Sequence, residues 1–136
     1  MKNFARIFLF AAYAVAVSAA WAVSPCDGVD RSLTNERKAA LDRGVAKQLD
    51  NSSVDVQESF QIGSWSIIYV ATHDSDDAYL FYSKDPLSSR PVATWGGVAL
   101  RNEEREIKKW TIKNAPGIPL RLASCFAWHV TQDRDL

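Results

Sequence analysis

Residues 54–72 read VDVQESFQIGSWSIIYVAT, and the spacing of their apolar side chains predicts two strands. Apolar and polar residues alternate over 54–62, which is typical of a strand with one buried face. Gly63 and Ser64 are turn-forming residues. The run 65–72 is apolar on both faces, which predicts a strand in the interior of a sheet. The short connection predicts that the two strands pair in antiparallel fashion.

The strand pattern continues towards the C-terminus. Residues 78–83 and 91–100 are predicted to form a third and a fourth strand, because each is a short apolar segment bounded by turn residues. A polar turn, residues 73–77, precedes the third strand, and a loop containing Pro86 follows it. These short connections predict a four-stranded antiparallel meander.

Helical patterns flank the predicted meander. Thr34 is a suitable N-cap for a helix in which Leu41, Val45 and Leu49 recur at four-residue spacing on one face. A second helix is predicted for residues 102–114, where glutamates stand at the start and lysines at the end. That order of charges complements the helix dipole.

The segment 120–130 fits two structures. Leu122, Phe126 and Val130 have helical spacing, whereas the same residues together with Leu120 and Trp128 fit one face of a strand. We predict a strand. The resulting fold class is α+β, an antiparallel sheet made of the meander and a C-terminal strand, with two helices packed on one face.

The N-terminus has the layout of a secretory signal peptide. Two basic residues precede an apolar run of eleven residues, 7–17, which is too short to span a membrane. Ala20 and Ala22 satisfy the small-x-small cleavage rule. We therefore expect residues 1–22 to be a cleavable signal and residues 23–136 to form one domain in the periplasm or outside a bacterial cell.

The chain contains two cysteines, Cys26 and Cys125. In an oxidising compartment only one intramolecular pairing is possible, so a structural disulfide is expected.

Charge and motifs exclude several classes of function. The whole chain has no net charge, and loss of the two basic residues of the signal leaves the domain slightly acidic. A basic nucleic-acid surface is therefore not expected. No two-histidine zinc spacing, phosphate-binding glycine loop or dinucleotide fingerprint occurs, so no cofactor or metal is predicted.

The densest polar cluster lies in the turn between the second and third strands and contains His73, Asp74, Asp76 and Asp77. A calcium loop would need glycine at its sixth position, where Tyr79 stands. A solvated hairpin tip explains these residues, and contact with a partner is the alternative.

Aromatic residues are abundant in the predicted domain. Ten large rings are present, and strand alternation places Tyr82 on the opposite face from Phe81. Helices on one side cannot cover both faces, so some rings are expected to be exposed. We predict a partner-binding surface of Tyr82 and Trp95 with the aspartates Asp74, Asp76 and Asp77. Simple core packing is the alternative.

Two further polar residues interrupt apolar patterns. Glu58 lies between inward-facing residues of the first strand. Three explanations are open: a catalytic carboxylate, a charge that protects a sheet edge, or a residue displaced by a bulge. His129 follows Trp128 near the C-terminus and is expected to be hydrogen-bonded.

The sequence favours a small exported binding protein without catalytic activity, such as an inhibitor or immunity-type protein that neutralises a cell-wall-degrading enzyme or a toxin. The alternative is a small periplasmic hydrolase or ligand-binding enzyme that uses His129 or His73 with a carboxylate. It requires those groups to converge in one pocket.

Overall fold

The structure is a computed structural model that describes residues 16, 18, 21, 23–51 and 53–133. Most of the predicted signal, including its cleavage site after Ala22, lies outside the described residues. Among the described residues, no helix combines the length and apolar character needed to cross a membrane.

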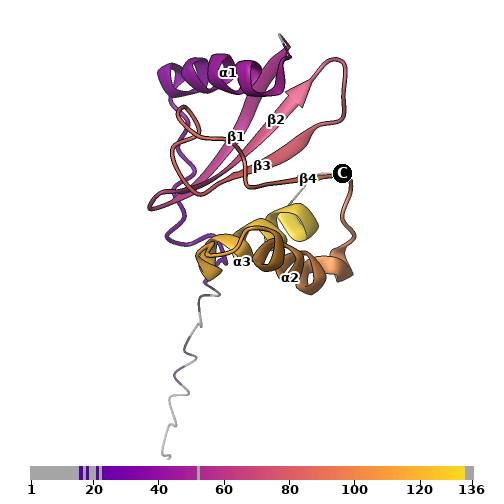
Figure 1. Cartoon of the computed structure of the whole chain (residues 1–136). Coiled ribbons are helices and arrows are strands. Elements are labelled where there is room, and N and C mark those ends of the chain that lie inside the picture. The colour runs from indigo at the N-terminus through magenta and orange to yellow at the C-terminus, as the bar shows by residue number, and fades with distance from the viewer. Residues whose placement is uncertain (1–15, 17, 19–20, 22, 52, 134–136) are drawn as a thin grey trace, which may run out of the picture.

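The domain is a four-stranded antiparallel sheet with strand order β1-β2-β3-β4, which confirms the predicted α+β class and meander. Figure 1 shows α1 on one face of this sheet and α2 and α3 on the other. The elements are α1 (Asn35–Leu49), β1 (Val54–Ile62), β2 (Trp65–Thr72), β3 (Ala78–Tyr82), β4 (Ala93–Gly96), a 3₁₀ turn (Arg101–Glu103), α2 (Glu104–Asn114), α3 (Leu120–Trp128) and a π-helical turn (His129–Asp133).

Local signals determine where α1 begins and ends. The Thr34 hydroxyl accepts a hydrogen bond from the Arg37 backbone N–H at 3.2 Å, as expected of an N-cap. Asp50 ends the helix in the left-handed conformation, with φ at 50°. Leu41 and Val45 are completely buried, so the predicted apolar face of the helix is the one that packs.

Helices cover both faces of the sheet, so the predicted packing of two helices on one face is wrong. Leu41 and Val45 of α1 belong to one core cluster, together with Ile68 and Leu80 of the sheet. Phe126 belongs to a second cluster on the opposite face. The physical reason is that β2 and β3 are apolar on both faces, and each face needs a cover.

A β-bulge in β1 allows one strand to serve both cores. Val56 pairs with Val70, but the next paired residue is Glu58, opposite Tyr69. The extra residue reverses the alternation, so that Val56 packs against α1 while Phe60 packs in the core beneath α3. The bulge, one of the explanations considered for Glu58, accounts for its position.

The predicted C-terminal strand is wrong, because residues 120–128 form helix α3. In a strand, Ala123 and Cys125 would lie on the face opposite Leu122 and Phe126. All four are completely buried in the structure. A helix satisfies this pattern, because its small residues pack closely while Leu122 and Phe126 reach the sheet four residues apart.

The expected disulfide between Cys26 and Cys125 is present, with the two Cα atoms 4.5 Å apart. It joins the segment before α1 to the buried face of α3. The segments that precede and follow the sheet in the sequence are therefore covalently linked.

Candidate functional site

The acidic turn between β2 and β3 is exposed, as predicted for a hairpin tip. Asp74 accepts a hydrogen bond from the Asn51 side chain at 3.2 Å. Asp77 accepts one from the Tyr69 hydroxyl at 3.2 Å, whereas Asp76 makes no hydrogen bond with a described residue. The tip is therefore held in place by its neighbours and still presents carboxylates to solvent.

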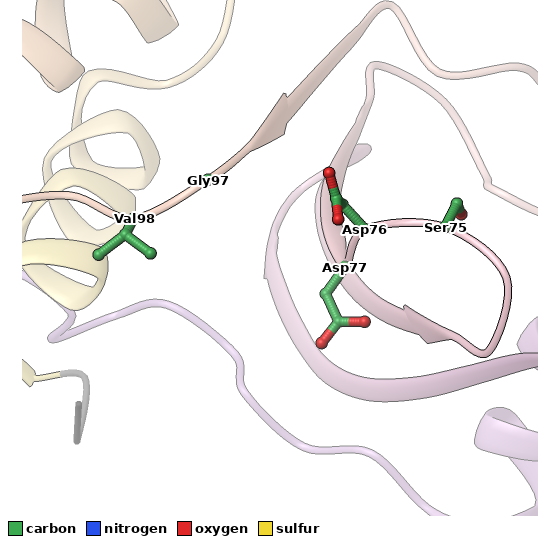
Figure 2. A pocket seen from close by; sticks show the side chains of 5 residues that line it. All are labelled: Ser75, Asp76, Asp77, Gly97 and Val98. Atoms are coloured by element: carbon green, nitrogen blue, oxygen red, sulfur yellow. The ribbon is translucent and has the colours of Figure 1, made fainter.

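Strand pairing places this acidic tip beside the segment that follows β4. Ala78, at the start of β3, pairs with Gly96 at the end of β4. Asp76 and Asp77 therefore face Gly97 and Val98 across a surface pocket of about 470 Å³, as Figure 2 shows. Ser75 completes the lining of this pocket.

Trp95 lies next to this pocket and is half-buried. Its ring packs edge-on against Phe126, with centroids 5.5 Å apart, and is tilted against Tyr79 at 5.9 Å. Trp95 also lines a second pocket, of about 370 Å³, between the end of β4 and one face of α2.

The second pocket has aromatic and acidic walls and shares Gly97 and Val98 with the first. Its remaining lining residues are Gly96, Glu103, Glu106, Ile107 and Trp110. We call the two pockets together the β4 groove. The groove combines two half-buried tryptophans with four carboxylates, of Asp76, Asp77, Glu103 and Glu106.

Of the predicted partner-binding residues, the structure brings Asp76, Asp77 and Trp95 together in the groove. Asp74 lies at the same tip but does not line either pocket.

Tyr82 does not belong to this surface. It is completely buried, and its hydroxyl donates a hydrogen bond to Gln48 of α1 at 2.8 Å. Burial raises the pKa of Tyr82 to about 12. Its proposal as an exposed partner contact is therefore wrong, because α1 covers the face of the sheet on which it lies.

Glu58 and His129 meet, although they are 71 positions apart in the sequence. The His129 Nε2 atom lies 3.0 Å from Glu58 Oε2, and Nδ1 lies 3.2 Å from Asp133 Oδ2. Arg31 donates to the second Glu58 oxygen at 3.1 Å. Two basic and two acidic groups thus form one network at the C-terminal end of α3.

The imidazole of His129 is almost fully enclosed. Only 6% of the residue is exposed, and its ring packs edge-on against Phe60 with centroids 5.0 Å apart. Each ring nitrogen is adjacent to a carboxylate oxygen, and a protonated ring would donate to both. Neither nitrogen is open to a third group in this arrangement.

Charge in the network alters the titration of Glu58. Burial raises the pKa of the Glu58 carboxyl, whereas the hydrogen bond and the charge of His129 lower it. The charge of Arg31 adds to this lowering, so the pKa of Glu58 lies below its usual range.

We expect Glu58→Gln to lower the free energy of unfolding by about 1–2 kcal/mol at pH 7, because it removes charged hydrogen bonds from a partly buried network. A lowered pKa contributes stability above the pKa of the unfolded chain and loses it as pH falls through the folded value. The difference between the wild type and the variant should therefore persist down to about pH 4.5 and shrink below it.

Urea denaturation at several pH values measures this difference. Asp76→Asn is the matched control, because Asp76 is exposed and makes no ion pair with a described residue. Equal stability of the Glu58 variant and the wild type at pH 7 would contradict the network's stabilising role.

No family model, curated protein or solved structure matches this chain. Within residues 23–51 and 53–133, no group of three or more histidine, cysteine, aspartate or glutamate residues has an arrangement that could hold a metal ion.

Proposed function

We propose that this chain is an exported binding protein without catalytic activity, which acts stoichiometrically on a protein partner through the β4 groove. The main support for this proposal is the groove itself, where Trp95 and Trp110 are half-buried beside four carboxylates. Tryptophans in partly enclosed positions often supply most of the energy of protein binding.

The scaffold beneath the groove supports this proposal. Trp95 packs on Phe126 of α3, and Cys125, the residue directly before Phe126, forms the disulfide with Cys26. A surface whose anchors are already ordered loses less entropy when a partner binds. This property would favour tight binding by an inhibitor or immunity-type protein that neutralises a wall-degrading enzyme or a toxin.

The alternative, a small hydrolase or ligand-binding enzyme, is favoured by the 3.0 Å contact between Glu58 and His129. The occupied ring nitrogens of His129 weigh against its use as a general base. His73, the other histidine of the enzyme hypothesis, is exposed at the β2–β3 turn. The enzyme hypothesis uses the His129 imidazole, whereas the binding hypothesis does not. Full partner binding by a His129→Gln variant would therefore support the binding function.

We expect Trp95→Ala to weaken partner binding by about 2 kcal/mol, about 30-fold, because it removes an aromatic anchor. Neutralising Asp74, Asp76 and Asp77 together should mainly slow association, and added salt should reduce that difference. The partner is captured from envelope extract with protein purified from the periplasm, and surface binding kinetics are recorded at two salt concentrations.

Trp128→Ala is the matched control, because Trp128 is half-buried on α3 and lines neither pocket. It should bind the captured partner like the wild type. Equal affinities of the Trp95 and Trp128 variants would place the interface outside the β4 groove.

A further inference from the structure

β4 forms the outer edge of the sheet. It pairs with β3 on one side, and no described strand pairs with it on the other. An edge strand presents backbone N–H and C=O groups that can pair with an extended chain. The segment that continues from this edge is also open, with Val98 68% and Leu100 61% exposed.

The charge of the groove has one sign. Asp76, Asp77, Glu103 and Glu106 line its two pockets, and neither lining contains a basic side chain. Two tryptophan side chains, Trp95 and Trp110, accompany these carboxylates. A cation above the face of a tryptophan is attracted by the ring, and a nearby carboxylate adds to this attraction.

The carboxylate of Glu103 is held in position by the backbone. Its Oε2 atom accepts a hydrogen bond from the Leu100 N–H at 2.7 Å, and the residue is half-buried. This bond fixes the side chain at the start of α2, where it lines the same pocket as Trp95 and Trp110.

Glu106 differs, because basic neighbours already contact it. Its Oε1 atom lies 3.4 Å from both Arg105 Nε and Lys109 Nζ, and all three side chains are largely exposed. Exposed ion pairs of this kind contribute little free energy. A cation bound inside the pocket can therefore replace them at small cost.

We infer that the β4 groove binds an extended, basic segment of the partner, with an arginine or lysine side chain held between Trp95, Trp110 and Glu103. Asp76 and Asp77 provide a second site for a basic side chain of the same segment. This inference rests on the proposed function and specifies the chemistry of the partner.

A five-residue peptide that alternates arginine and valine, with both ends blocked, tests the inference. It is titrated into the protein purified from the periplasm while the indole N–H signals are followed by NMR. Saturable shifts of the Trp95 and Trp110 signals are expected, with Trp→Phe variants providing the assignments. The Trp65 and Trp128 signals should stay in place.

A second peptide carries citrulline at each arginine position and so keeps the shape while it removes the charge. It should bind at least about tenfold more weakly, because the cation–π and ionic attractions are lost. Equal affinity of the two peptides, or shifts confined to tryptophans outside the groove, would overturn the inference.

Variants of the protein give an independent readout. Glu103→Gln keeps an oxygen that can accept from Leu100, and Asp76→Asn disturbs no hydrogen bond, so the double variant should fold normally. We expect it to bind the arginine peptide about tenfold more weakly. The control, Glu36→Gln with Asp50→Asn, removes the same charge from α1 and its C-cap and should bind like the wild type.

The outcome is distinguishable from failure of the proposed function. If the arginine peptide does not bind at millimolar concentration while partner capture still depends on Trp95, the basic-segment inference is wrong and the binding function stands. If the captured partner ignores Trp95, the proposed interface fails as well.

Discussion

Replacement of Phe126 by alanine is expected to lower the free energy of unfolding by about 3–5 kcal/mol. Phe126 is completely buried, and its ring packs edge-on against three others at centroid distances of 5.0–5.5 Å, those of Tyr79, Phe81 and Trp95. Alanine would leave a cavity among rigid rings that cannot move together to fill it. Urea denaturation measures the loss.

Leu120→Ala is the matched control on the same helix, because Leu120 is 63% exposed. Its effect should stay within about 0.5 kcal/mol. Similar losses for the two variants would contradict the helical assignment of residues 120–128, since a helix is what separates Phe126 from Leu120 by exposure.

Removal of the disulfide by Cys26→Ala and Cys125→Ala is expected to lower the free energy of unfolding by about 3–5 kcal/mol. The bond closes a loop with a sequence separation of 99, and a long loop greatly restricts the unfolded chain. Alanine is chosen because Cys125 is completely buried, where a serine hydroxyl would need a partner.

Denaturation with and without reductant provides the control. Reductant should lower the stability of the wild type to that of the double variant and should leave the variant unchanged. A loss below about 1 kcal/mol would contradict the predicted stabilising effect of the disulfide.

The strands and first two helices could be predicted because their signals are local. Thr34 caps α1, and the apolar spacing within each segment is set by its own periodicity. The arrangement of layers could not be predicted, because it depends on which face of β2 and β3 each helix covers. The bulge at Gln57 was one of three explanations for Glu58, and the even spacing of Val54, Val56 and Phe60 gave no sign that these residues lie on different faces.

The candidate site was predicted in part. Asp76, Asp77 and Trp95 are polar or aromatic residues beside turns, and strand register then brings them together. Tyr82 was misplaced because its expected exposure depended on the prediction that helices cover only one face of the sheet. Trp110 was not predicted to belong to the site, although its helical spacing from Glu103 and Glu106 indicates a common face.

The position of the disulfide sets an order of events during biosynthesis. A chain made from its N-terminus presents the thiol of Cys26 long before Cys125 appears, and the chain has no other cysteine. All four strands lie between the two residues. The sheet can therefore pair before the bond forms, and the bond requires that Cys125 of α3 lie against the segment around Cys26.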